Sequence, residues 1–276
     1  MHARWRIVRI ATREAFLKSA SVRVGLFLLA YMLLLWLASI PKGMAPPRFA
    51  DITWGMTASV AILGMTLLFL RRERRAPHDV GLGVDARTAW RFTGGILLGV
   101  TVYGVTLLCI SLAVGPLVVA SASQPSARVV VLMVCSFIAL SSMEELGFRG
   151  YPLRTLTTAI GTWRAQVIVA IAFGLSHVAF GWPWQAIVLG VIPSAVLFGT
   201  TAIVSGGLAM PIGLHAAVNF AQWAVGEKSS RGFWTVTVDP LLAARAATLA
   251  PYIGATVPLL FSAVLWWWHT RHLQRT

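Results

Sequence analysis

Residues 129–150, VVVLMVCSFIALSSMEELGFRG, join an apolar run to two adjacent carboxylates, Glu144 and Glu145. The run has the composition of a membrane-spanning helix, and the two acids come where such a helix should still lie in lipid. The chain has only nine acidic residues, and this pair is the only acid between Asp85 and Glu227. An ionisable side chain within a span is costly and by default indicates a functional site. The segment therefore predicts a membrane helix that carries a functional centre.

The composition of the whole chain is that of a membrane protein. Hydrophobic residues make up 57% of the sequence and charged residues 12%, with a mean hydropathy of +0.75. A helix needs about 20 apolar residues to cross the hydrocarbon core, and no alternating strands of barrel type are present. The sequence thus predicts an all-α, polytopic membrane helical bundle with about eight transmembrane helices. They are expected near residues 22–40, 52–70, 92–114, 129–151, 164–182, 185–204, 208–226 and 251–268.

The net charge of +14 is distributed as a topology signal, so we expect contact with the lipid bilayer and no nucleic-acid partner. Basic residues are dense before the first span, between the second and third, between the fourth and fifth, and after the last. Because positive residues stay on the cytoplasmic side, this pattern predicts that both termini are cytoplasmic. The basic set consists of 20 Arg and 3 Lys, which favours a GC-rich bacterial genome and hence a bacterial inner membrane.

Helix geometry separates the two acids of the opening segment. Residues four apart lie on nearly the same helical face, so Glu145 and Arg149 are expected to form an ion pair that lowers the cost of burying both. Glu144 points about 100° away and has no partner on its own helix. An unpaired carboxylate in a low-dielectric site suits a general base. The alternative is that the two acids mark the helix end at the membrane surface.

Two later spans carry further polar residues, in AFGLSHVAFG and PIGLHAAVNF. His177 lies one turn after Phe173, while His215 and Asn219 are four apart and point to one side of their helix. An imidazole and a carboxamide presented together can stabilise a developing oxyanion. Either histidine alone is more typical of a side chain satisfied by a backbone carbonyl between packed helices. The combination on three spans indicates one shared site.

The three motifs EELGFR, FGLSH and HAAVN, in this order on successive spans, resemble the EExxxR, FxxxH and HxxxN motifs of the CPBP family of intramembrane proteases. This family includes the type II CAAX prenyl proteases (Ras-converting enzyme) and the bacteriocin-processing and self-immunity proteins. The resemblance covers roughly residues 125–226. We therefore interpret residues 1–124 as an N-terminal amphipathic segment with three spans, 125–226 as a catalytic core, and 227–276 as an extracytoplasmic loop with the last span.

The resemblance implies an intramembrane endopeptidase that acts on a membrane-anchored peptide or protein. Glu144 and His177 would activate the attacking water, and His215 and Asn219 would stabilise the oxyanion. Glu145 and Arg149 would support the site. The resemblance further implies an alternative metalloprotease mechanism, in which Glu144, His177 and His215 would bind zinc. We favour the mechanism without a cofactor, since HExxH is absent.

The depth of the site in the membrane depends on the lengths of two helices. Two rival functions also stay open. If the fourth and seventh helices are longer than hydropathy indicates, Glu144, His177 and His215 would meet around a cavity that opens to the cytoplasm or inner leaflet. The first rival is a non-catalytic immunity or scaffold protein of the same fold. The second is a proton-coupled transporter, which would be expected to show repeat symmetry that this sequence lacks. The sequence does not indicate an oligomeric state or whether the substrate is prenylated.

Overall fold

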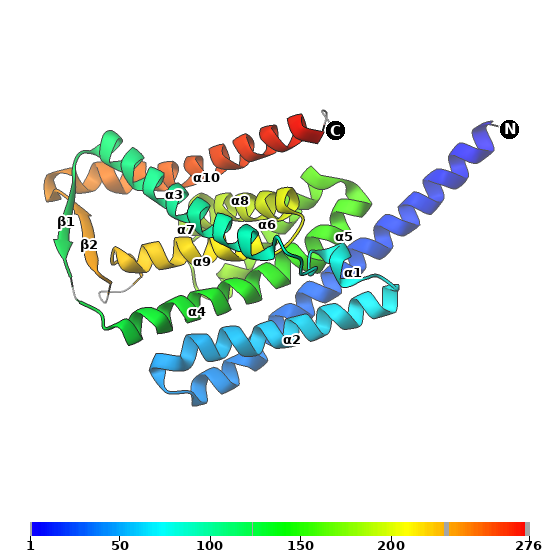
Figure 1. The fold of residues 1–276 in the computed structure, drawn as a ribbon. Coiled ribbons are helices and arrows are strands. Elements are labelled where there is room, and N and C mark those ends of the chain that lie inside the picture. The colour runs from blue at the N-terminus through cyan, green and yellow to red at the C-terminus, as the bar shows by residue number, and fades with distance from the viewer. Residues whose placement is uncertain (1, 123, 229–231, 274–276) are drawn as a thin grey trace.

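The computed structural model describes residues 2–122, 124–228 and 232–273, with side chains described within residues 19–272 of these ranges. It is a bundle of helices, as the sequence predicts (Figure 1). In chain order the helices are α1 (His2–Met44), α2 (Ala50–Glu73), α3 (Thr88–Val114), α4 (Ala127–Glu145), α5 (Tyr151–Ile160), α6 (Thr162–Val178), α7 (Trp184–Ala186), α8 (Ile192–Ser205), α9 (Ala209–Ala224) and α10 (Ala243–Leu273). Short 3-10 turns precede α2, α3 and α10, and π-helical turns lie at Leu146–Gly150 and Ile187–Val191.

Six helical segments within the described residues are long and apolar enough to cross a membrane. They are Ser19–Met44, Pro47–Glu73, Thr88–Val114, Ala127–Ile160, Trp184–Ser205 and Pro240–His272. Their outer faces present side chains that suit lipid, such as Leu29, Val60, Leu112 and Leu260, each more than half exposed. The chain is therefore an integral, multi-pass membrane protein.

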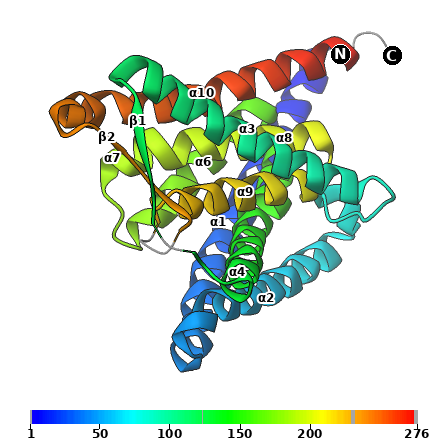
Figure 2. The ribbon, with the colours of Figure 1, turned by 60° about the vertical axis from the view of Figure 1, so that its left-hand side comes forward.

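The remaining two predicted spans correspond to α6, of 17 residues, and α9, of 16 residues. All eight predicted stretches overlap helices, while the number that cross the membrane stays a prediction. The α9 helix lies against α3, α4 and α8, so its polar residues face other helices (Figure 2). It occupies residues 209–224 within the predicted 208–226, and the expectation of a longer seventh helix is wrong. Gly206, at φ +72°, ends α8 just before it, and Gly226, at φ +86°, lies in the turn just after it.

The fourth predicted span does run on, as expected. Its helical segment continues from Ala127 to Ile160, because the π-helical turn joins α4 directly to α5. Gly147 in this turn lies against the ring of Tyr31 on α1, where an added Cβ would come within 2.2 Å of a ring carbon. Turns of this π type occur preferentially at functional sites. Here the turn follows directly after Glu145 and contains Arg149.

Two short strands were not predicted from the sequence. β1 (Leu117–Ser121) and β2 (Trp234–Val238) pair antiparallel, with Leu117 opposite Val238. They tie the connection between α3 and α4 to the connection between α9 and α10. This small sheet lies at the end of the bundle opposite the two chain termini (Figure 1).

The end that holds both termini is also the end that holds most of the basic residues. Arg75 Nη1 at the end of α2 donates to Thr155 Oγ1 on α5 (2.9 Å). Arg23 on α1 pairs with Glu73 on α2 (3.3 Å). The chain thus begins and ends at the same end of the bundle (Figure 1). That this end is cytoplasmic stays a prediction.

Candidate active site

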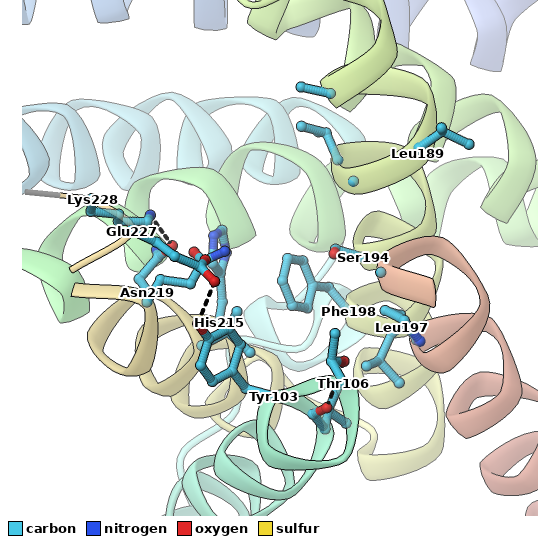
Figure 3. A pocket seen from close by; sticks show the side chains of 18 of the residues that line it. Tyr103, Thr106, Leu189, Ser194, Leu197, Phe198, His215, Asn219, Glu227 and Lys228 are labelled. Atoms are coloured by element: carbon cyan, nitrogen blue, oxygen red, sulfur yellow. Dashed lines mark hydrogen bonds between the residues drawn. The ribbon is translucent and has the colours of Figure 1, made fainter. Parts of the chain in front are cut away.

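Four of the predicted site residues line one cavity of about 610 Å³. Glu144 comes from the end of α4, His177 from the end of α6, and His215 and Asn219 from one face of α9. Figure 3 shows His215 and Asn219 on one side of this cavity and the apolar side chains of α8 on the other. The polar faces of the three helices thus meet around one cavity, as the helical spacing predicts. Glu145 and Arg149 lie behind this wall, each with a fully buried side chain.

The predicted ion pair between Glu145 and Arg149 is present. Arg149 Nη1 lies 3.3 Å from Glu145 Oε1, and Nη2 donates to the carbonyl of Ala195 (3.1 Å). The guanidinium also lies 4.3 Å from the ring centre of Phe173, a cation–π arrangement. These contacts compensate much of the desolvation of a buried arginine, and they join α4, α6 and α8.

Glu145 has a second partner that the sequence did not reveal. Its Oε1 lies 2.9 Å from Nδ1 of His215, across the interface between α4 and α9. An ionised carboxylate only accepts hydrogen bonds, so Nδ1 of His215 carries the hydrogen. Phe198 stacks on the imidazole at 4.3 Å with an interplanar angle of 17°. The imidazole of His215 is therefore held in one orientation by its hydrogen bond to Glu145 and by the stacked ring of Phe198.

The other nitrogen of His215 is turned toward Glu144. Nε2 lies 3.7 Å from Glu144 Oε2, and 21% of the Glu144 side chain is exposed. This separation is longer than a direct hydrogen bond, and both groups border the cavity. With Nδ1–H directed to Glu145, Nε2 of the neutral ring is an acceptor, whereas Nε2 of the doubly protonated ring is a donor. The carboxylates of Glu144 and Glu145 flank the ring from two sides.

His177 is held by its own helix. Its Nδ1 lies 2.9 Å from the carbonyl of Phe173, so Nδ1 donates and Nε2 is free to act in the cavity. Trp182 meets the ring edge-on at 5.2 Å. His177 thus bonds to a backbone carbonyl, as expected of a packed histidine, and it also lines the cavity. Within the described chain, the ion-pair contact of Glu144 is with His215 and not with His177.

Three further polar residues at the cavity were missed by the sequence analysis. Lys228 Nζ donates to Asn219 Oδ1 at 2.5 Å, and Tyr103 Oη donates to Glu227 Oε1 at 2.6 Å. Figure 3 shows these four side chains and His215 gathered on one side of the pocket. Tyr103 lies on an apolar helix, and the other two lie in a connecting segment, so no spacing rule links them to the motifs.

The cavity reaches the surface at the end of the bundle opposite the termini. Its exposed rim includes Trp182 and Gln185 before α8 and Lys228 after α9. With cytoplasmic termini this rim would lie on the extracytoplasmic side, in conflict with the expectation of a cavity that opens to the cytoplasm or inner leaflet. The physical reason is the direction of the helices, since α6 and α9 both end at the rim while the chain ends at the opposite side.

Zinc binding by Glu144, His177 and His215 would require these side chains to converge on one point. Among the described residues, no group of three His, Cys, Asp or Glu side chains is arranged to hold a metal ion. The mechanism without a metal stays a prediction. We derive no step through a metal.

These features define a helical membrane protein with an acid–histidine–amide cluster buried at the wall of an internal cavity. Residues 126–221 match the model of a family described as type II CAAX prenyl endopeptidase Rce1-like. The match contains all six predicted site residues, and the family resemblance read from the motifs is confirmed over this segment. This family implies CAAX-type intramembrane protease activity in broad terms. No curated protein matches the chain.

Proposed function

We propose that this protein is an intramembrane endopeptidase that hydrolyses a peptide bond of a membrane-associated peptide or protein. The observation that carries the proposal is the approach of Glu144 Oε2 to His215 Nε2, 3.7 Å apart in the wall of a cavity. His177 and Asn219 border the same space. A base, two imidazoles and a carboxamide around one cavity form the set that peptide hydrolysis requires.

In this mechanism Glu144 is the general base. It takes a proton from a water molecule as the water oxygen bonds to the carbonyl carbon of the substrate. The carbonyl π bond breaks and leaves a tetrahedral oxyanion. When the carbon–nitrogen bond breaks, the proton returns from Glu144 to the amine nitrogen. The products are a carboxylic acid and an amine, and the enzyme is unchanged. His177 orients the water through Nε2, because its other ring nitrogen, Nδ1, is bonded to the carbonyl of Phe173.

The oxyanion is stabilised by Asn219 Nδ2 and His215 Nε2. For His215 this role requires the doubly protonated ring, because its Nδ1–H is already directed to Glu145. The carboxylates of Glu144 and Glu145 lie on either side of this ring, at its Nε2 and Nδ1 respectively. Donors held in place before the reaction stabilise the transition state without reorganisation. Glu145 and Arg149 act through His215 and are positioning residues.

The proposed mechanism uses glutamate and histidine with no metal cofactor. This preference rests on the absence of an HExxH motif and on Asn219 beside His215, which suits an oxyanion better than a metal. The proposed location is a bacterial inner membrane, with the termini in the cytoplasm as the charge pattern predicts. On that topology the rim of the cavity faces the extracytoplasmic side, so a substrate enters from that side or from the adjacent membrane leaflet. We propose no nucleic-acid partner.

The experiment that tests this function is cleavage by the purified protein in liposomes. A panel of membrane-anchored peptides, with and without a prenylated cysteine, is incubated with wild type and with Glu144→Ala. We expect at least one peptide to be cut by wild type and none by the variant, with cut sites located by mass spectrometry. Binding of a peptide without any cleavage would instead support the non-catalytic immunity or scaffold reading.

A further inference from the structure

Lys228 lies outside the segment that matches the protease family, yet it contacts one of the predicted site residues. Its ammonium nitrogen is 2.5 Å from Oδ1 of Asn219, nine residues earlier in the chain. The turn after α9 makes this contact, because Gly226 has a φ of +86° and reverses the chain. The amide N–H of Gly226 donates to the carbonyl of Trp223 (3.1 Å). An ordinary side chain at position 226 would be strained.

The segment that carries Lys228 is anchored at two further points. The amide N–H of Glu227 donates to the carbonyl of Gln222 (2.9 Å), and the Glu227 carboxylate accepts from Tyr103 on α3 (2.6 Å). The residue directly before Lys228 is thereby tied to α9 and α3 at the rim of the cavity. This arrangement places a fixed cation next to the side-chain amide of Asn219 (Figure 3).

The chemistry of the contact determines which way the Asn219 amide points. A lysine ammonium has only hydrogen-bond donors, while an asparagine side chain has one acceptor oxygen and one donor nitrogen. The atom that faces Lys228 must therefore be Oδ1. Since the amide is planar, Nδ2 then points away from Lys228. The oxygen and nitrogen of an asparagine are otherwise free to exchange places by rotation of the side chain.

We propose that Lys228 is a positioning residue, which holds Oδ1 of Asn219 so that its Nδ2–H group is presented to the oxyanion of the substrate. This inference rests on the proposed protease function. Without Lys228 the amide can rotate and present Oδ1, which an oxyanion repels. Lys228 thus acts on the reaction through Asn219.

The surroundings of Lys228 are consistent with a structural cation. Burial of the ammonium group lowers the pKa of Lys228, and the carboxylates of Glu144 and Glu227 oppose this shift. By its surface area the residue is exposed, and its position is argued from its contacts. The ammonium also lies 5.6 Å from the ring centre of Phe137 on α4. Contacts of this kind fix the ammonium with respect to α4 and α9 together.

The test is a double-mutant cycle on the peptide cut by wild type. Lys228→Met, Asn219→Ala and the double variant are compared by kcat and KM in liposomes. Loss of one preorganised oxyanion donor costs about 10²–10³ in turnover, and we expect this for Asn219→Ala. Lys228→Met should lower kcat by about tenfold with little change in KM, because a misplaced donor is only partly lost. In the Asn219→Ala background the same change should have no further effect on kcat.

Two controls accompany the cycle. Lys228→Arg keeps a donor-only cation and should recover most of the wild-type kcat. Lys42→Met removes a lysine at the same end of the bundle, where it pairs with Asp51 (3.1 Å) and lies over Trp54, and it should leave kcat unchanged. Melting temperatures are measured for every variant, and Lys228→Gln replaces Lys228→Met if the latter is unstable.

The outcomes separate the two proposals. If wild type cuts no peptide, the protease function fails, and the role of Lys228 fails with it. If wild type cuts but Lys228→Met is fully active, only the positioning role is overturned. An equal loss of kcat from Lys228→Met with and without Asn219 would overturn it as well, because the lysine would then act independently of the amide.

Discussion

Glu145 Oε1 lies 2.9 Å from Nδ1 of His215, so a buried carboxylate of α4 orients an imidazole of α9. The same oxygen is 3.3 Å from Arg149. One carboxylate therefore joins the internal ion pair of α4 to the wall of the cavity. Its neighbour Glu144, one residue earlier, borders the cavity and lies 3.7 Å from the other ring nitrogen of His215. The two adjacent acids have different surroundings because successive helix positions point about 100° apart.

Glu145→Gln should lower kcat on the order of 10²-fold or more, in line with the cost of neutralising a carboxylate that orients a catalytic histidine. The amide of Gln can rotate and present its NH₂ group to Nδ1 of His215, so it no longer fixes the ring as the carboxylate does. Steady-state cleavage in liposomes measures the effect. Glu73→Gln is the matched control, since Glu73 is a largely buried carboxylate paired with Arg23 and Arg75 at the opposite end of the bundle. It should reduce stability and leave kcat of the folded protein unchanged. Equal kcat losses for both variants would contradict the orienting role.

Arg149→Ala should destabilise the protein by about 3–5 kcal/mol, because it leaves Glu145 buried without its cation. Thermal unfolding in detergent measures this loss. Arg154→Ala is the control, because Arg154 donates to the carbonyl of Ala202 (2.6 Å) from a partly buried position, with no carboxylate partner among the described ion pairs. We expect a clearly smaller drop in melting temperature for this variant. An Arg149→Ala protein as stable as wild type would show that the pair contributes nothing.

Much of this site could be predicted from the sequence, because its local relationships follow from helix geometry. The pairing of Glu145 with Arg149 and the shared face of His215 and Asn219 need only a four-residue spacing. The bond between Glu145 and His215 joins residues 70 positions apart. It depends on the rotation and depth of two helices, which no local pattern specifies. Lys228 was missed because a turn, and not a helix, brings it back to Asn219.

The direction of the cavity gives a test of membrane topology. With Cys109 and Cys135 replaced, Gln185→Cys at the rim should react with a membrane-impermeant maleimide added to intact spheroplasts. Arg72→Cys, at the end of α2 near the termini, should react only after the membrane is opened. The expectation follows from the basic residues gathered at the terminal end. The reverse labelling pattern would place the cavity on the cytoplasmic side and would contradict the topology predicted from the basic residues.

Exhaustive chelation should leave the rate of cleavage unchanged, because the described donors do not gather into a three-ligand site. Elemental analysis of the purified protein should find no stoichiometric zinc. Both measurements use wild type, with an established zinc protease as the control for complete chelation. Activity that is lost on chelation and restored by zinc would point to Glu144, His177 and His215 as ligands.

The central claim is that Glu144 is the base that activates water. Its most direct test is the cleavage rate of Glu144→Gln in liposomes, measured with its melting temperature. Gln keeps the size of the side chain and removes its ability to take a proton. The account predicts a protein that folds with a melting temperature close to wild type and cuts the substrate peptide at no measurable rate. Cleavage by Glu144→Gln at the wild-type rate would contradict it.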